Sequence, residues 1–334
     1  MGHPRTIAVF RALQLGDMLC AVPALRALRG LYPQAVITLI GLPWAAQFRQ
    51  RFARYLDRFI AFPGYPGLPE QAPDIRATLG LFQWARGRFD LALQMHGSGA
   101  LTNSLLLLLG ARRSAGFHPA RGWCPGPEGW WPYPEDAHEV HRNLRLVRYL
   151  GASDIGAVND RLEFPLTEAD RHEAAEHARS VGLVLAPDAA YVCLHAGARH
   201  AAKRWAPERF AQVGAALAAR GYQVVLTGSA AERPLAAAVA AAMRAPAINL
   251  ACDISIGGMA ALMAGARVVV SNDTGAAHLA VALDVPTVVI FFATDAARWA
   301  PLDLRRHRVL ANASGVEVPD VLAALDELLV LEQR

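Results

Sequence analysis

The residues with the clearest chemical capacity lie near the end of the chain, in Ser271-Asn-Asp-Thr-Gly275 and His278. A β-branched run at 268–270 stops just before them, and the Ala/Leu-rich segment 276–283 after them is typical of a helix. The unpaired N–H groups and positive dipole end of that helix would face this polar stretch, which favours phosphate as a ligand. The pattern therefore predicts a phosphate-binding loop.

Asp273 has two interpretations, because its negative charge would repel a phosphate at the same place. Its carboxylate either caps the helix or accepts hydrogen bonds from sugar hydroxyls beside the phosphate. His278 lies four residues after Thr274 and so faces the same side of the first turn, where it either contacts the ligand or is structural. Together with the loops described next, this context favours Asp273 as a sugar ligand, with Thr274 capping the helix.

Two earlier loops also follow predicted strands. In the first, Gly197 and Ala198 are small enough for backbone to approach a ligand, and Lys203 and Arg204 supply positive charge. In the second, Glu232 falls in the first turn of a helix, where it either serves the helix dipole or accepts a ribose hydroxyl. The cations could equally be solvated surface groups. The three loops together hold the polar groups that a nucleotide diphosphate needs.

Asp17 is the candidate acid or base of the first half, since Gly16-Asp17 separates the first predicted strand from its helix. It is either an N-cap or, if a sugar donor occupies the other domain, the base that deprotonates an acceptor hydroxyl. No Gly-x-Gly-x-x-Gly or Walker-type loop is present, which disfavours a nicotinamide, flavin or P-loop protein. There is no Asp-x-Asp pair either, so we expect no metal or cofactor, and Lys203, Arg204 and a helix N-terminus would neutralise the leaving charge.

The elements that must position these residues alternate between strand and helix patterns. In the first half we predict strands at 6–10, 35–40, 58–62 and 90–95 and a short one ending at 117, with helices at 18–31, 44–52, 75–86, 101–109 and 136–150. Residues 118–134 are rich in Pro, Gly and Trp and read as an irregular loop. That loop either shapes a cleft or is a surface connection pinned by buried Trp123, Trp130 and Trp131.

The second half repeats the alternation. We predict strands at 191–195, 223–226, 247–250 and 268–270 and a last one before 292, with helices at 168–181, 207–220, up to 243, 257–263, 276–283 and 319–331. Such repetition predicts the α/β class, with two Rossmann-like doubly wound domains that meet near residue 165. Ligands bind outside the carboxyl ends of strands in these sheets, where each candidate loop falls.

Composition agrees with an intracellular enzyme acting on anions. A chain of 334 residues is long enough for two domains, and its net charge of +4 comes with arginines that are spread out rather than gathered into a nucleic-acid stripe. Anionic small molecules or an anionic membrane surface are therefore expected partners. We find no apolar run of spanning length and no signal peptide, and the four separated cysteines suit a reducing compartment, so we expect a cytoplasmic, soluble protein.

Taken together, these motifs resemble those of the ADP-heptose:lipopolysaccharide heptosyltransferases, glycosyltransferase family nine. The resemblance covers nearly the whole chain, and its motifs occur in the family's order. They are Leu15-Gly-Asp-Met-Leu19 with Pro23-Ala-Leu25, His195-Ala-Gly-Ala198 with Lys203-Arg-Trp205, Gly228-Ser229 with Glu232, Ser271-Asn-Asp-Thr-Gly275 with His278-Leu-Ala280, Asp284-Val-Pro-Thr287, and Thr294-Asp295.

The resemblance implies two facing Rossmann-like domains, the GT-B fold, and inverting transfer without a metal. Residues 1–165 would bind the acceptor, residues 166–334 the nucleotide sugar, and the helix 319–331 would pack back on the first domain. It also implies roles for single residues. Asp17 would be the base, Lys203 would contact phosphate, Glu232 ribose and Asp273 the sugar, Thr274, Gly275 and His278 would surround the diphosphate, and Ile254 would pack on the base.

These implications give a specific hypothesis. Heptose would move from ADP-heptose to the lipopolysaccharide inner core, a lipid A-type acceptor, by an enzyme in peripheral contact with the inner membrane. Two alternatives remain open at this stage. One is a GT-B glycosyltransferase that uses another donor, such as a UDP- or GDP-sugar, and the other is a non-catalytic nucleotide-sugar-binding protein.

Overall fold

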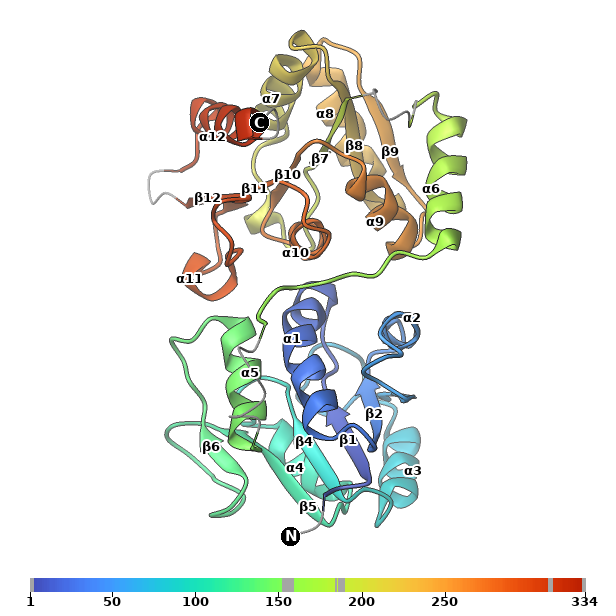
Figure 1. Ribbon diagram of the computed structural model, residues 1–334, viewed down its shortest axis with the longest axis vertical. Helices are drawn as coiled ribbons and strands as arrows, with labels where there is room; N and C mark the ends of the chain where they lie inside the picture. The colour runs from blue at the N-terminus through green and yellow to red at the C-terminus, as the bar shows by residue number, and fades with distance from the viewer. Residues whose placement is uncertain (1–2, 152–158, 184, 186–189, 312–314, 332–334) are drawn as a thin grey trace. The chain divides into compact units, whose positions relative to one another are not determined.

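The computed structural model describes residues 3–151, 159–183, 185, 190–311 and 315–331. The chain divides into two compact units, Met1–Asp160 and Arg161–Arg334, which are labelled by element in Figure 1. The polar segment 151–160, which we expected to lead to a linker, falls mostly outside the described residues. The boundary near residue 165 and the separate roles of the two domains stay predictions.

The first unit contains a parallel sheet in the order β3-β2-β1-β4-β5-β6. Its strands are β1 (Thr6–Phe10), β2 (Val36–Gly41), β3 (Arg58–Ala61), β4 (Leu91–Gln94), β5 (Arg113–His118) and β6 (Trp130–Pro132). Its helices are α1 (Leu15–Leu31), α2 (Ala45–Arg51), α3 (Ile75–Ala85), α4 (Thr102–Leu108) and α5 (Glu139–Tyr149). The strand order reverses between β1 and β4, the kind of point at which doubly wound sheets bind ligands.

The central strand β1 explains why the apolar run at the N-terminus is continuous. It pairs in parallel with β2 on one side and β4 on the other, and Ile7 to Phe10 are fully buried. Helices α3 and α4 both pack on one core cluster that includes Phe10, whereas α1 lies against α5. A strand covered on both faces needs apolar residues at every position, so its sequence does not alternate.

The second unit has a parallel sheet in the order β12-β11-β10-β7-β8-β9. Its strands are β7 (Tyr191–His195), β8 (Gln223–Ser229), β9 (Ile248–Cys252), β10 (Val269–Asn272), β11 (Thr287–Phe291) and β12 (His307–Ala311). Its helices are α6 (Glu168–Ser180), α7 (Pro207–Ala219), α8 (Arg233–Met243), α9 (Ile256–Ala264), α10 (Gly275–Ala282), α11 (Ala296–Trp299) and α12 (Val318–Leu331), with single 3-10 turns η2 (Ala201–Lys203) and η3 (Ala230–Glu232). The expected α/β class is thereby confirmed for both units.

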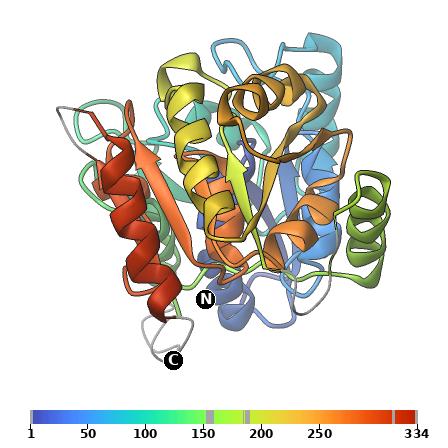
Figure 2. The ribbon, with the colours of Figure 1, turned by 90° about the horizontal axis from the view of Figure 1, so that it is seen from above.

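The last helix belongs to the core of the second unit. Buried Val321, Leu325 and Leu328 join the same apolar cluster as Phe210 of α7, and Figure 2 shows α12, in red, running beside α7 and the sheet. The indole N–H of buried Trp205 donates to the carbonyl of Val316, 2.9 Å away, just before this helix begins. A return of the helix to the first domain stays a prediction.

Three elements were missed by the sequence patterns: β6, α11 and β12. Strand β6 lies inside the expected loop 118–134 and pairs with β5; it has only three residues, too few to show a period. The tryptophans of that loop also differ from one another. Trp130 is buried, Trp131 stacks on Tyr149 with ring centroids 4.7 Å apart, and Trp123 is exposed, so the expectation that all three are buried is wrong.

Candidate active site

The candidate donor loops of the second unit lie at one edge of its sheet. They follow β7, β8, β9 and β10, which are neighbouring parallel strands in the order β10-β7-β8-β9. Parallel strands end at the same edge, so the sheet brings the segments around Lys203, Glu232, Ile254 and Asp273 together. This confirms the expectation that each loop falls at a carboxyl end.

Asp273 does not cap the helix that follows it. The N-cap of α10 is Thr274, as the sequence suggested, although its side chain makes no capping hydrogen bond, so only the interpretation of Asp273 as the cap is wrong. Instead, the Oδ2 atom of Asp273 lies 3.3 Å from Nζ of Lys203 and also accepts a hydrogen bond from the hydroxyl of Thr294. The Thr274 hydroxyl faces Ser271, at 3.4 Å between the oxygens. Asp273 is thus committed to side chains from distant loops.

The environment of Asp273 suits a ligand-binding carboxylate. The residue is only 5% exposed, and a buried carboxylate needs an ionic or hydrogen-bonded partner, which Lys203 supplies. The Lys203 side chain keeps 29% exposure and can therefore reach an anion. Nε2 of His278 lies 3.9 Å from the other carboxylate oxygen, too far for a direct hydrogen bond. His278 also packs edge-on against the Trp299 ring, which gives it a structural contact.

Asn272 holds the Lys203 loop in place, and sequence reasoning missed its role. Its side chain is fully buried, its Oδ1 accepts from the backbone N–H of Trp205 at 2.9 Å, and its Nδ2 donates to the carbonyl of Ala196 at 2.9 Å. An amide has both donors and acceptors, so this one side chain of β10 holds both ends of the loop that follows β7. An asparagine placed between a buried strand and Asp273 was the available signal.

Arg204 serves its own loop in this structure. Its Nε and Nη2 atoms both donate to the carbonyl of Ala198, at 2.9 and 2.7 Å. These bonds close the loop that begins at Gly197. In the closed loop, Lys203 faces Asp273. Of the two cations considered from the sequence, only Lys203 contacts a carboxylate of the candidate site.

Glu232 has the helix-start role that its sequence position suggested, and its contact with a ribose hydroxyl stays a prediction. Its Oε2 accepts from the backbone N–H and the hydroxyl of Ser229, at 2.9 and 2.8 Å, in a capping box. Burial alone would raise its pKa, but the hydrogen bonds from Ser229 and the charge of Arg204 lower the pKa. It therefore stays ionised and can still accept a ribose hydroxyl.

Gly197 is required by the closeness of Glu232. A Cβ atom on Gly197 would lie 2.1 Å from Oε1 of Glu232, well inside van der Waals contact. Nearby His195 is buried and its Nδ1 is 3.2 Å from the Thr227 hydroxyl. Burial lowers its pKa despite the neighbouring Glu232 carboxylate, so the imidazole is neutral.

Ile254 occupies the turn between β9 and α9, as expected for a residue at the edge of the site. It is half-buried and lies against Gly258 in the first turn of α9. That turn is capped by Ser255, whose hydroxyl accepts from the N–H of Gly258 at 3.0 Å. An apolar side chain held at this position could pack on a planar base.

In the first unit, Asp17 lies in the first turn of α1 and is not its N-cap. The helix begins at Leu15 with Gln14 as the N-cap, because the N–H of Met18 already bonds the carbonyl of Gln14 at 3.0 Å. The apolar periodicity begins only at Met18 and so placed the start too late. A carboxylate in the first turn is favoured by the helix dipole.

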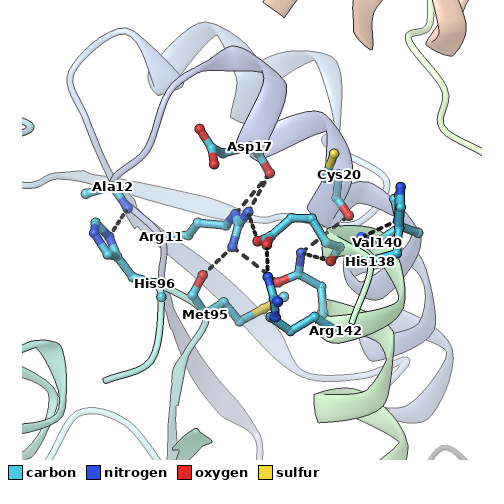
Figure 3. Close-up of polar contacts among 12 residues, drawn as sticks. Arg11, Ala12, Asp17, Cys20, Met95, His96, His138, Val140 and Arg142 are labelled. Atoms are coloured by element: carbon cyan, nitrogen blue, oxygen red, sulfur yellow. Dashed lines mark hydrogen bonds and ion pairs between the residues drawn. The ribbon is translucent and has the colours of Figure 1, made fainter. Parts of the chain in front are cut away.

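A buried ionic network lies directly beneath this turn, and sequence reasoning missed it (Figure 3). Arg11 is 2% exposed and donates from Nη2 and Nε to the carbonyl oxygen of Asp17, at 2.6 and 3.2 Å. It also pairs with Glu139 of α5 at 3.2 Å, bonds the Oδ1 of Asn143 at 3.2 Å, and donates to the carbonyl of Met95. An arginine ending a buried strand was the only signal available.

Two features are absent from the described residues. No helix among them is long and apolar enough to cross a membrane. No cluster of three or more His, Cys, Asp or Glu side chains within the described ranges is arranged to hold a metal ion.

Two doubly wound parallel sheets with polar loops at their carboxyl ends form an architecture of the GT-B type. The sequence pattern of glycosyltransferase family 9 (heptosyltransferase) matches residues 81–318, more than half of the chain. The chain therefore belongs to this family, and it is a glycosyltransferase.

Known relatives agree with this assignment. The chain is 36% identical to lipopolysaccharide heptosyltransferase 1 of Pseudomonas aeruginosa over 141 residues, which cover 40% of this chain and 37% of that protein. It is 32% identical to lipopolysaccharide heptosyltransferase 3 of Escherichia coli over 159 residues, 42% of this chain and 47% of that protein. These matches span less than half of either relative. A longer match, at 26% identity, covers 83% of this chain and 80% of lipopolysaccharide heptosyltransferase 2 of Salmonella typhimurium.

Solved structures confirm the fold. A glycosyl transferase family 9 structure from Veillonella parvula superposes with a TM-score of 0.80 at 21% identity, covering 98% of this chain and 97% of the other. The E. coli ADP-heptose lps heptosyltransferase II gives 0.73 at 23%, covering 98% and 100%. The E. coli heptosyltransferase WaaC with ADP gives 0.66 at 20%, covering 97% and 99%. Identities this low establish the shared GT-B architecture only.

Proposed function

We propose that this glycosyltransferase moves heptose from ADP-heptose to the inner core of lipopolysaccharide. Family membership supports a heptose donor, and the relatives named above are lipopolysaccharide heptosyltransferases. Two related structures were obtained with ADP and with ADP-2-deoxy-2-fluoro heptose. The acceptor is a lipid-anchored saccharide, so the enzyme works at the cytoplasmic face of the inner membrane in peripheral contact with it.

The observation that carries the donor site is the placement of Asp273. Its carboxylate is buried, spared from capping α10, and held by Lys203 and Thr294. A carboxylate fixed in this way accepts hydrogen bonds from sugar hydroxyls, while Lys203 and the N-terminus of α10 at Gly275 face the diphosphate. Glu232 accepts from ribose, Ile254 packs on adenine, and Gly197, Ala198, Thr274 and His278 complete the walls.

The transfer follows from these groups and from Asp17. The carboxylate of Asp17 takes the proton of an acceptor hydroxyl, and that oxygen attacks the anomeric carbon of the heptose. The bond from the anomeric carbon to the diphosphate breaks, and ADP leaves with the electron pair. Attack opposite the leaving group inverts the anomeric centre. Lys203 and the helix N-terminus stabilise the charge on the departing phosphate without a metal ion.

Calorimetric titration with ADP, UDP and GDP tests the donor. We expect ADP to bind at least tenfold more tightly than the other two, and a preference for UDP or GDP would mean a different nucleotide sugar. Turnover of ADP-heptose with heptose-free lipopolysaccharide tests the enzyme assignment. Binding of ADP with no transfer to any lipopolysaccharide acceptor would favour a non-catalytic binding protein.

A further inference from the structure

Helices α3 and α4 present an apolar surface that the sugar-transfer site does not use. Of the fourteen large hydrophobic residues exposed in the described chain, six come from these two helices and the residue preceding α4. They are Ile75, Leu79 and Trp84 on α3 and Leu101, Leu107 and Leu108 at α4. Both helices pack on the same core cluster and so cover the same face of the first sheet. We call these six residues the α3–α4 surface.

The two helices lie close together at their C-terminal ends. The N–H of Gly87, after α3, donates to the carbonyl of Gly110, after α4, at 3.0 Å, and Gly110 lies against Arg86. An open groove of about 330 Å³ continues the surface past Trp84 to the edge strand β3, where Ile60 and Pro63 line it. The exposed apolar side chains are therefore gathered on one side of the unit instead of scattered.

Charge identifies what this surface binds. Residues 75–89 and 101–118 contain five arginines and no aspartate, glutamate or lysine, and the flanking acidic residues are Asp74, which caps α3, and Asp90, which pairs with Arg112 at 3.5 Å. The arginines are exposed and are Arg76, Arg86, Arg88, Arg112 and Arg113. Apolar side chains bordered by an excess of arginines match the acyl chains and anionic headgroups of a bilayer, and this excess of positive charge favours a lipid surface over a protein partner.

Trp84 has the form of an interfacial anchor. Its ring is exposed, and the guanidinium of Arg88 lies 5.0 Å from the ring centroid. The Nε of Arg88 also donates to the carbonyl of Trp84 at 2.7 Å, which fixes the cation beside the ring. Tryptophan prefers the headgroup level of a membrane, and the adjacent arginine can reach a lipid phosphate.

We propose that the α3–α4 surface docks the enzyme on an anionic lipid bilayer. The proposal rests on the proposed function, since a lipid-anchored acceptor lies in such a membrane. The α3–α4 surface contains none of the proposed donor-binding residues. The contact combines shallow insertion of the leucines and Trp84 with attraction between arginines and phosphates.

Sedimentation with vesicles tests the docking surface. We expect the wild-type protein to bind vesicles of phosphatidylcholine with one quarter phosphatidylglycerol at least tenfold more tightly than phosphatidylcholine alone, with binding weakened by salt. The double variant Leu79→Ser/Leu108→Ser should lose at least tenfold, and so should Arg86→Gln/Arg88→Gln. Leu302→Ser/Leu304→Ser, equally exposed in the second unit, is the matched control and should bind as the wild type does.

The proposal fails if the wild type ignores anionic vesicles or if the control variant loses as much as the α3–α4 variants. It also fails if those variants abolish a dimer seen by light scattering while vesicle binding is unchanged. Calorimetry with ADP separates this result from the proposed function. If the α3–α4 variants lose vesicle binding but still bind ADP, the result supports docking. If the wild type fails to bind ADP, the result counts against the transferase proposal alone.

The buried network under Asp17 carries a second, independent inference. Arg11 reaches the backbone of Asp17, while the carboxylate of Asp17 points away from the guanidinium (Figure 3). Arg11 is itself fixed by Glu139 and Asn143 of α5, and Glu139 pairs with buried Arg142 at 2.5 Å. The first turn of α1 is thus tied to α5 through buried charge-assisted bonds.

We infer that Arg11 is a positioning residue for the proposed base. It cannot take the substrate proton, because a guanidinium stays protonated, and its bonds go to the carbonyl of Asp17. A lysine at this position keeps the charge but has a single donor atom and cannot reproduce the forked contacts. Misplacing the base by a fraction of an ångström lowers the rate of proton transfer while donor affinity is unchanged.

The test is a double-mutant cycle of Arg11→Lys and Asp17→Asn, measured with ADP-heptose and truncated lipopolysaccharide. Arg11→Lys should lower kcat at least tenfold with the donor KM within twofold of wild type. On the Asp17→Asn background it should cause no further loss, because the group it positions is gone. Arg29→Lys is the matched control, since Arg29 ties the other end of α1 to the carbonyls of Ala35 and Tyr55.

The outcomes separate two failures. If Asp17→Asn loses activity but Arg11→Lys keeps it, or if Arg29→Lys lowers kcat as much as Arg11→Lys, the positioning role is overturned. Equal losses from Arg11→Lys in both backgrounds would also overturn it, because they would reflect general damage to the fold. If Asp17→Asn retains full turnover, the assignment of the base itself is wrong.

Discussion

At the scale of single residues, the candidate site depends on which partner each charged group has. Asp273 could have capped α10, and the structure gives it Lys203 and Thr294 instead. Glu232 keeps a helix-start role through Ser229 and yet remains an ionised acceptor. Carboxylates near helix starts therefore have different functions, and the partner atoms within hydrogen-bonding distance determine which function each one has.

Replacing Asp273 by Asn should lower kcat/KM for ADP-heptose by about 100-fold while ADP affinity changes by less than about threefold. An amide would present a donor where the sugar hydroxyl expects an acceptor, but the diphosphate contacts would remain. Steady-state kinetics and calorimetry with ADP measure the two effects. The control is Asp295→Asn, because Asp295 caps the short helix α11. Equal losses of ADP and sugar-nucleotide affinity would argue against a sugar contact.

Gly197→Ala tests the tight packing of the first donor loop. The added Cβ would meet Oε1 of Glu232 at 2.1 Å and push that carboxylate away, so ADP should bind about tenfold more weakly. Gly221→Ala is a useful contrast: a Cβ there meets nothing within 4 Å, and only the positive φ of 90° is strained. It should lower stability without altering ADP affinity. Normal ADP binding by Gly197→Ala would disconnect this loop from the nucleotide.

At the scale of elements, the start of α10 shows why a helix N-terminus in this fold is left open. Its N-cap side chain makes no bond to the first turn, whereas α6 begins with a complete capping box between Thr167 and Asp170. Because the N-cap side chain does not occupy the first N–H groups of α10, a ligand's phosphate can bind them beside Asp273 and Lys203. The two helices therefore offer a matched pair for mutagenesis.

Thr167→Ala should cost about 1 kcal/mol of unfolding free energy, the usual value for a lost cap. Thr274→Ala should cost less than about 0.5 kcal/mol, because no capping bond is lost. Urea denaturation followed by circular dichroism measures both. If Thr274→Ala were as costly as Thr167→Ala, the threonine hydroxyl would be capping α10 after all.

At the scale of the whole molecule, stability should depend on pH through a buried histidine far from the donor loops. Burial lowers the pKa of His307 to about 4, despite nearby Asp303 and Asp284, and its Nδ1 has no hydrogen-bond partner in the described structure. In the unfolded chain, the imidazole of His307 takes up a proton near the ordinary histidine pKa of 6.5. The folded protein therefore binds fewer protons than the unfolded chain between these values.

The stability contributed by neutral His307 is full above pH 6.5 and is lost as pH falls toward 4, by up to about 3 kcal/mol. Unfolding free energies from urea titrations at pH 7.5 and 5.0 should therefore differ less in His307→Phe than in the wild type. His172→Gln, at an exposed position on α6, should retain the wild-type difference. A pH dependence that is unchanged in His307→Phe would show that other groups control it.

Much of this architecture could be predicted from the sequence because its signals are local. Strand β7 was predicted at its observed bounds, and α7 begins at Pro207 as expected, since buried β-branched runs and Pro or Gly at helix ends depend on neighbouring residues. The donor loops were located for the same reason: each follows a strand. Short elements such as β6 were missed because three residues show no period.

The sequence by itself determined the α/β class, the loops that carry the polar residues, and the family to which the chain belongs. Only the tertiary structure decided that Asp273 pairs with Lys203, 70 residues earlier, and that Arg11 pairs with Glu139, 128 residues later. Periodicity describes how a residue meets its own element, whereas these partners are chosen by strand order and by the need of each buried charge for an opposite one. The open helix end beside Asp273 is the consequence that matters for function.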